Sequence, residues 1–137
     1  MKIDENYAGL TQIENGDYVL EGDLISNDGI EIDLDDRLIV KGIVKAMRSI
    51  TVIKTLIAGC GIKAGCGIEA GCGIEAGDGI EAGWGIEAKT YIHSDKRIFA
   101  GISVCRNSDN CIKTIICAEL RKGEICYGDL VIRKDES

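Results

Sequence analysis

Proline is absent from this chain of 137 residues, and aromatic residues make up only 4% of it. A core of this size normally depends on Phe, Trp and Leu, whereas the prominent residues here are Ile, Ala and 18 glycines within a sequence that is 45% hydrophobic. Such a composition favours narrow, regular layers over an irregular core. At this length we expect one domain.

Long hydrophobic runs are also missing. No stretch approaches the roughly 18 apolar residues of a membrane span, because Gly, Lys or Glu interrupts every run. The first residues, MKIDE, lack the basic and then apolar pattern of a signal region. We therefore expect a cytoplasmic protein that does not interact with membranes.

Basic residues are few and unevenly placed. The net charge is −7. Residues 1–37 contain eleven acidic residues against Lys2 and Arg37, whereas residues 38–58 contain four basic residues and no acid. Direct nucleic-acid binding is not expected, since phosphate contacts need a clustered basic surface. An acidic surface fits either a basic partner or plain solubility.

A six-residue period runs through the middle of the chain. From residue 62 to residue 85 the sequence reads IKAGCG, IEAGCG, IEAGDG and IEAGWG. The period extends both ways, so that twelve hexads follow one another without an insertion. Each has an aliphatic residue first and an apolar or small residue two places later. The first positions are Ile32, Leu38, Val44, Ile50, Leu56, Ile62, Ile68, Ile74, Ile80, Ile86, Ile92 and Ile98.

The spacing of the two series predicts strands. The first and third positions share one face of a strand but not of a helix, and each repeated glycine disfavours a helix by about 1 kcal/mol. Each hexad is therefore expected to be a short strand followed by a bend, where glycine permits positive φ and close backbone approach. One such strand buries too little by itself, so successive coils must stack into a continuous core.

The fifth position of the hexad indicates which residues face outward. It holds Arg48, Lys54, Asp78 and Trp84 among others. A buried column would not tolerate unpaired Arg, Lys and Asp. We place the fifth position at outer corners and the first and third positions inside.

The pattern resembles the hexapeptide repeat of left-handed parallel β-helices, and the coil pattern is also similar to that of bactofilins. The family motif is a small residue, any residue, an aliphatic residue, Gly or an acid, and two variable positions. The hexad at residues 62–67 fits with its large and small inward positions exchanged. The resemblance implies a triangular coil of three hexads, about 18 residues. Residues 32–103 would then form four coils, about 19 Å tall at roughly 4.8 Å per layer.

Both ends depart from this period. Residues 1–31 are expected to form an acidic segment and a first, irregular coil, because their alternating apolar residues lie two residues out of phase. The regular solenoid spans residues 32–104. In segment 105–137, two strand-like stretches flank the turn Arg121-Lys122-Gly123. We predict a C-terminal β-hairpin that caps the last coil, since an open coil exposes its edge and core. The expected fold is an all-β, single-domain parallel β-solenoid.

Residues that suggest chemistry are scarce. His93 is the only histidine. Hexapeptide acyltransferases, which have similar coils, use a histidine between subunits, but they also carry loops that leave the coil, and residues 32–103 have no insertion to supply one. We read His93 as a surface residue. Glycines that recur in every hexad without a strand-to-helix transition do not indicate a nucleotide site. We therefore expect no catalytic residue and no cofactor.

Outward glutamates recur at the second position of the hexad. In a coil of three hexads Glu69 stacks under Glu87, and Glu81 stacks over Lys63. They form either a solvated face or a regular acidic surface that imitates a phosphate backbone, with Trp84 as a binding anchor at an exposed corner. The candidate partner-binding residues are Glu69, Glu75, Asp78, Glu81, Trp84 and Glu87.

Three functions follow from these features. The first is a non-catalytic protein-binding solenoid, more narrowly an inhibitor carried by a phage or mobile element. It would act on a basic, nucleic-acid-binding defence protein, as acidic DNA-mimicking anti-CRISPR proteins do. The second is a self-assembling scaffold, since the resemblance to bactofilins implies homo-oligomers formed through the solenoid ends. The third, an acyltransferase, is disfavoured by the missing loops.

The seven cysteines are not expected to pair or to bind metal. The number is odd and no signal region precedes them. Cys60, Cys66 and Cys72 are spaced one hexad apart and should lie on three different corners. The others, Cys105, Cys111, Cys117 and Cys126, lack the closely spaced pairs of structural zinc sites.

We therefore predict no disulfide among Cys60, Cys66 and Cys72 and no bound zinc. Mass spectrometry of the native protein should give the mass of the fully reduced, metal-free chain. A loss of two hydrogens within the repeat, or a zinc adduct, would contradict this prediction.

Overall fold

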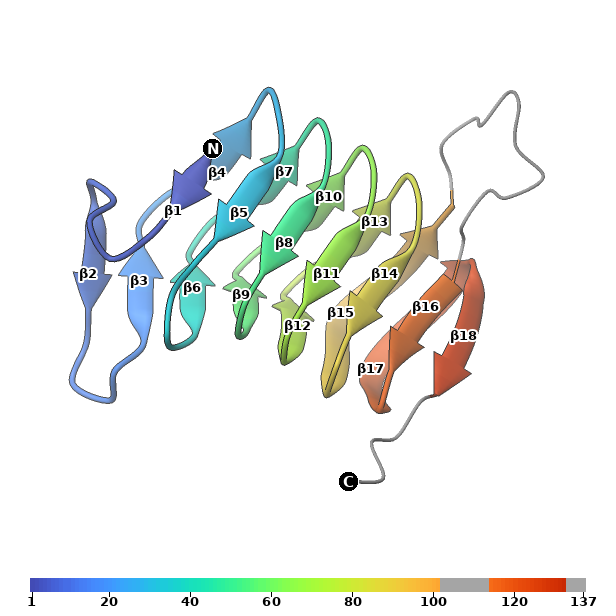
Figure 1. Ribbon diagram of the computed structural model, residues 1–137. Coiled ribbons are helices and arrows are strands. Elements are labelled where there is room, and N and C mark those ends of the chain that lie inside the picture. Colours follow the sequence, from blue (N-terminus) through green and yellow to red (C-terminus); the bar gives the residue numbers. More distant parts are fainter. Residues whose placement is uncertain (102–113, 133–137) are drawn as a thin grey trace.

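The protein is a parallel β-solenoid. A computed structural model describes residues 1–101 and 114–132, which form β-strands and no helix (Figure 1). The strands wind through about six turns in one domain. The predicted fold class is confirmed. The solenoid is longer than the four coils expected, because both ends of the chain continue the winding.

The solenoid has three faces. On the first, β2 (Leu10–Gln12) pairs with β3 (Tyr18–Leu20), which is followed by β6 (Leu38–Val40), β9 (Leu56–Ala58) and β12 (Gly73–Ala76). On the second lie β4 (Leu24–Ser26), β7 (Val44–Ala46), β10 (Ile62–Ala64) and β13 (Ile80–Ala82). On the third lie β1 (Lys2–Ile3), β5 (Ile30–Ile32), β8 (Ile50–Val52), β11 (Ile68–Ala70), β14 (Ile86–Ala88), β16 (Thr114–Cys117) and β18 (Asp129–Ile132). The long strands β15 (Tyr91–Ala100) and β17 (Glu119–Tyr127) run across the first and second faces.

The register of the central coils is three hexads, as the resemblance implied. Ile62 pairs with both Val44 and Ile80, which lie three hexads before it and three hexads after it. The first and third hexad positions are buried throughout the repeat, and the fifth positions Cys60, Asp78 and Trp84 are exposed. The predicted inside and outside positions are therefore confirmed, and isoleucines stack on isoleucines to form the core.

The repeat glycines are needed for close approach and not for positive φ. Among the described residues, the glycines with positive φ are Gly9, Gly16, Gly22, Gly101, Gly123 and Gly128, and none lies within residues 59–85. A Cβ atom at Gly65 would instead overlap the carbonyl group of Met47 in the preceding coil, and one at Gly71 would overlap that of Ile53. The expectation of positive φ at these bends was wrong, whereas the expectation of close backbone approach is confirmed.

The coil that begins at β3 is two residues longer than the later ones. Leu38 pairs with Leu56 at the usual offset of three hexads, whereas the offset between Ile30 and its partner Ile50 is longer by two residues. Ile32 therefore occupies the second inward position of β5, opposite Val52, and not the first position of a hexad as the period predicted. The two extra residues fall in the bend between β5 and β6, where Leu34 is still buried.

The C-terminal strands do not form the predicted hairpin. β16 and β18 pair in parallel on the third face, and β17 pairs in parallel with β15. Gly123 lies inside β17, at φ +136°, where this strand turns from the first face to the second. The segment from β16 to β18 is therefore a further coil of the solenoid.

One aromatic side chain ties three consecutive coils together on the first face. The Tyr91 ring lies over the backbone of Gly73 in the coil below, and its hydroxyl donates to Glu75 Oε2 at 2.8 Å. Arg121, from the coil above, lies 3.8 Å from the ring centroid. Burial, together with the hydrogen bond to Glu75, raises the pKa of Tyr91 to about 12, so this ring remains a neutral donor at physiological pH.

We predict that Gly73→Ala destabilises the protein by about 1–3 kcal/mol, since the added methyl group overlaps the buried Tyr91 ring and forces it out of place. Gly67→Ala is the matched control. It occupies the same hexad position, but its Cβ would meet the Gly85 carbonyl oxygen at 3.4 Å, an ordinary contact, and we expect no loss. Urea unfolding of both variants measures the difference, and equal stabilities would contradict the assigned role of Tyr91.

Candidate functional site

The six candidate residues are distributed over all three faces of the solenoid. Glu75 lies on the first face, Glu81 on the second, and Glu69 and Glu87 on the third. Asp78 occupies the corner between the first and second faces, and Trp84 the corner between the second and third. The single acidic surface that the sequence suggested is not formed by these residues.

Three of the six do come together. Glu69 and Glu87 are direct neighbours on β11 and β14, as the coil of three hexads predicted. Both line a groove of about 410 Å³ on the third face, together with Trp84, Thr51 and Ile116. Trp84 is 43% exposed at the rim of this groove. We call Glu69, Trp84 and Glu87 with their shared cavity the Trp84 groove.

The two glutamates of the Trp84 groove repel each other. Their strands are parallel neighbours in register, so the backbones that carry them are about 4.8 Å apart. Neither forms an ion pair with a described residue. Like charges directly opposite each other on adjacent strands are destabilising. The groove therefore carries, beside an exposed indole ring, two negative charges that no described residue compensates.

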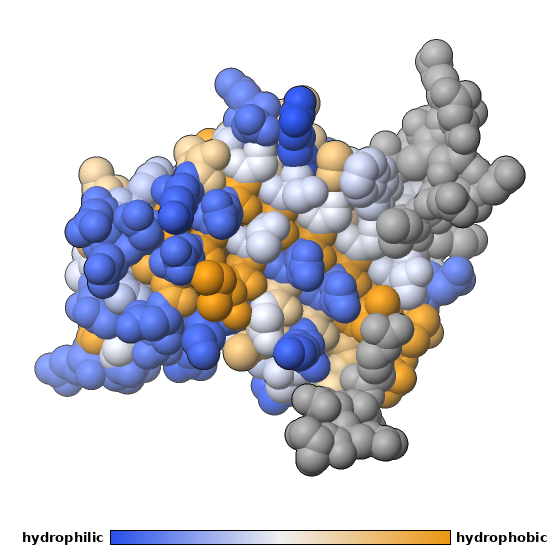
Figure 2. Space-filling model, viewed as in Figure 1, coloured by the Kyte–Doolittle hydropathy of each residue, from blue (hydrophilic) through white to orange (hydrophobic). Residues whose placement is uncertain are grey.

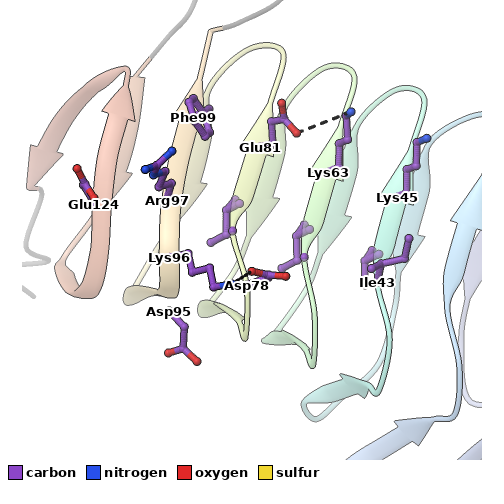
Figure 3. A pocket seen from close by; sticks show the side chains of 15 residues that line it. Ile43, Lys45, Lys63, Asp78, Glu81, Asp95, Lys96, Arg97, Phe99 and Glu124 are labelled. Atoms are coloured by element: carbon purple, nitrogen blue, oxygen red, sulfur yellow. Dashed lines mark ion pairs between the residues drawn. The ribbon is translucent and has the colours of Figure 1, made fainter.

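The other three acidic candidates are already paired. Glu75 accepts the hydrogen bond from Tyr91. Glu81 Oε2 lies 3.7 Å from Lys63 Nζ, as the stacking predicted, and Asp78 Oδ1 lies 3.2 Å from Lys96 Nζ (Figure 3). These last two pairs line a larger groove of about 900 Å³ on the second face. Its mixed charges give it no net preference for a cation.

The N-terminal end of the solenoid concentrates negative charge. Because sequence position becomes height in a solenoid, the eleven acids of residues 1–37 gather in the first coil and the strands around it. Figure 2 shows hydrophilic residues crowded at this end of the molecule. Three of the eleven form ion pairs, Asp17 with Arg37, Asp28 with Arg48 and Asp33 with Lys2, and the other eight form none with a described residue.

One of these pairs has a buried carboxylate and a half-exposed guanidinium, and it holds the first coil to the next. The Arg37 guanidinium donates to both carboxylate oxygens of Asp17, at 3.0 and 2.7 Å, and Asn15 donates to Asp17 as well. Asp17 itself is only 2% exposed. The hydrogen bonds from Arg37 hold the pKa of Asp17 below its usual value.

The remaining sequence-selected residues lie apart from the Trp84 groove. Cys60, Cys66 and Cys72 occupy three different corner columns, as predicted: Cys60 lies next to Asp78, Cys66 next to Trp84, and Cys72 next to Thr90. His93 faces outward on β15, with its Nε2 3.0 Å from Asp95 Oδ1, and Lys122 Nζ is 3.5 Å from the same oxygen. Burial raises the pKa of Cys117. Cys105 and Cys111 lie outside the described residues.

Within residues 1–101 and 114–132, no group of three His, Cys, Asp or Glu side chains is arranged to hold a metal ion. The same residues contain no helix of the length and hydropathy needed to cross a membrane. Comparison of the chain with models of protein families, with curated proteins and with solved structures finds no match.

The sequence analysis identified the members of the Trp84 groove but not their grouping. The stacking of the glutamates follows from the period alone. The position of Trp84 beside them depends on the backbone conformation of the bend between β13 and β14. Neither the contacts of Tyr91 with Gly73, Glu75 and Arg121 nor the Asp17–Arg37 pair was predicted from the sequence. An isolated Tyr and a buried Asp gave no periodic signal by which to recognise them.

We predict that Asp17→Asn lowers the free energy of unfolding by about 2 kcal/mol at pH 7, since it removes the charge of a buried carboxylate that accepts two hydrogen bonds from Arg37. The pKa of Asp17 is lowered in the folded state, so its contribution is present above the unfolded value of about 3.9 and is lost as the pH falls through the folded value. The stability difference between wild type and variant should therefore shrink below about pH 4. Denaturant titrations at pH 7 and pH 3 measure it.

The control is Asp33→Asn, which removes an exposed pair with Lys2 at 3.8 Å. It should change stability by less than about 0.5 kcal/mol. A pH-independent difference for the Asp17 variant would show that its charge does not stabilise the first coil.

Proposed function

We propose that the protein is a non-catalytic binding module that recognises a basic protein partner through the Trp84 groove. The observation that carries this proposal is that an exposed Trp84 shares one groove with Glu69 and Glu87, which form no ion pair within residues 1–101 and 114–132. The other acidic candidates do not offer such a site, because each of them already has a partner.

The chemistry of the Trp84 groove fits an arginine or lysine side chain. A guanidinium group stacks on an indole face and donates to carboxylates at the same time. A cation placed between Glu69 and Glu87 would remove the repulsion between them, so binding would relieve an unfavourable interaction of the free protein. Trp and Arg are also the residues most often found at the centres of protein interfaces.

The acidic N-terminal end supports the same function at longer range. Eight carboxylates without an ion pair to a described residue create a negative potential that attracts a positively charged partner and speeds its approach. The Trp84 groove would then supply the specific contact, and the N-terminal end the attraction.

Our narrower proposal is an inhibitor of a nucleic-acid-binding defence protein, carried by a phage or mobile element. Proteins that bind nucleic acid expose Arg and Lys side chains for phosphate contacts. Those side chains are the groups that the Trp84 groove fits. An acidic module that covers them would compete with the nucleic acid.

The alternative, a scaffold that polymerises end to end, requires two open ends. At the N-terminal end the inward residues Ile3 and Leu24 are fully covered, and Tyr7 and Leu10 pack against the core. The geometry therefore favours the binding module over a filament.

The binding proposal predicts a partner whose capture from a bacterial lysate depends on the Trp84 groove. Trp84→Ala should weaken binding by about 2 kcal/mol, roughly 30-fold. The double substitution Glu69→Lys, Glu87→Lys should abolish it while the fold is kept, since both side chains point outward. Affinity should also fall steeply with salt, because exposed charges are screened beyond about 8 Å at physiological ionic strength.

The matched control is Glu14→Lys, Glu31→Lys, which changes the net charge equally at two exposed positions outside the groove. It should slow association but leave the bound complex largely intact. If both double variants lose the same affinity for the partner, the partner responds to the net charge of the protein, and the Trp84 groove is not the binding site. Filaments of the purified wild type that are indifferent to the glutamate substitutions would favour the scaffold instead.

A further inference from the structure

At the C-terminal end of the solenoid, no described strand covers the core. On the third face, Leu130 stacks on Ile115 and Ile132 stacks on Cys117, so both side chains of β18 continue inward-facing columns. Ile115 and Cys117 are at most 1% exposed, whereas Leu130 is 40% and Ile132 48% exposed. No described strand pairs with the outer edge of β18.

The same change occurs on the other two faces. Leu120 and Ile125 of β17 continue the columns of Ile92 and Ile98, which are fully buried in β15. Leu120 and Ile125 are only partly buried. β17 is likewise the last strand of its sheet among the described residues. All three faces therefore end in apolar side chains that no described residue covers, and Figure 2 shows hydrophobic residues gathered over β16 and β18.

The N-terminal end is built differently. β1 pairs with β5 and buries Ile3 completely, and β2 closes the first face by pairing antiparallel with β3. The outermost strand of the second face is β4, but its Leu24 is 1% exposed. The coil at this end also carries the excess of negative charge. A second molecule could not stack its own N-terminal end there without strong repulsion.

We infer that the C-terminal coil pairs with the C-terminal coil of a second copy of this chain. An occupant of this end must present free strand edges and apolar side chains at the spacing of one coil. The open coil of another molecule has both. The N-terminal end of another molecule does not, because its core is covered. The pairing is thus isologous and gives a two-fold symmetric dimer.

The symmetry fixes how the strands meet. A two-fold axis perpendicular to the solenoid axis keeps the handedness of the coil but reverses the direction in which the strands of the second copy run. The strands that face each other across the interface are therefore antiparallel. An axis through the third face sets β18 against β18 of the partner copy. The half of β17 on the first face then lies opposite the partner copy's half on the second face, but one layer further from the interface, because β18 continues the winding beyond β17 on the third face alone. Strand pairing between the two copies is therefore confined to β18.

The charges of the last coil permit this contact. The strands β16, β17 and β18 contain Glu119, Arg121, Lys122, Glu124 and Asp129, which nearly balance. The two acidic N-terminal ends lie at opposite tips of the dimer, as far apart as possible. Because those tips are closed, the assembly stops at two copies. This inference does not depend on the proposed function, and it would give the dimer two separated Trp84 grooves.

Sedimentation velocity and light scattering after gel filtration, with the full chain between about 1 and 200 μM, test the inference. Wild type should form a dimer at the upper concentrations and nothing larger. Leu130→Lys, Ile132→Lys should raise the dimer dissociation constant at least tenfold. The control Met47→Lys, Ile53→Lys changes two apolar residues on the side of the solenoid that are at least as exposed, and it should leave the dimer unchanged.

If the Leu130→Lys, Ile132→Lys variant loses its β-type circular dichroism spectrum, it has unfolded, and Val131→Lys is tested in its place. Val131 stacks on the outward Ile116 and is 36% exposed, so the substitution alters the edge without placing a charge in the core. It too should weaken the dimer at least tenfold. A wild type that stays monomeric throughout would show that residues of the same chain cover this end, and would overturn the inference. Open-ended polymers, or a dimer indifferent to all β18 variants, would overturn it as well.

Discussion

Every coil of this protein has to cover the apolar side chains of the coil before it, in register. The strands from β6 to β14 are only three or four residues long and bury two inward side chains each, so none of them is stable by itself. Stacking Ile on Ile and Ala on Ala at an offset of three hexads solves this problem along the whole repeat. The same register determines the surface, because residues that alternate with the core columns are aligned into columns too. Glu69 and Glu87 are neighbours for the reason that Ile68 and Ile86 are neighbours.

The regular part of this structure could be predicted from the period, and the ends could not. Ile62 and Ala64 were placed inside, and Trp84 at a corner, because two series in one phase leave a single arrangement. Near the start, Ile30, Ile32 and Leu34 alternate and are all buried, so either of two phases satisfies the pattern. Near the end, a glycine between two strands is equally compatible with a hairpin turn and with a solenoid corner. In both cases the structure is determined by parallel pairing between residues far apart in the sequence, which the local sequence pattern does not indicate.

The candidate site shows the same division. The period gave the stacking of Glu69 on Glu87 and of Glu81 on Lys63. It did not show that Glu75 and Asp78 are paired by Tyr91 and Lys96, so it overestimated the extent of the acidic surface. When the paired residues are left out of the candidate set, the smaller Trp84 groove remains, with Glu69, Trp84 and Glu87. The two ends of the solenoid also differ in a way that composition alone obscures. One end is acidic and has a covered core, and the other ends in apolar side chains that no described residue covers.

The three-sided coil also constrains how such a chain can change in length. Inserting or deleting one hexad would keep the core columns continuous, because each hexad has the same two inward positions, yet it would move all later residues onto the next face. If the change fell between β5 and Trp84, Trp84 would keep its position relative to the later coils. It would no longer lie beside the face that carries Glu31. A change of three hexads, by contrast, would add or remove one layer of about 4.8 Å and keep every face aligned. The distance between the acidic tip and the Trp84 groove can thus vary only in whole layers if their relative orientation is to be maintained.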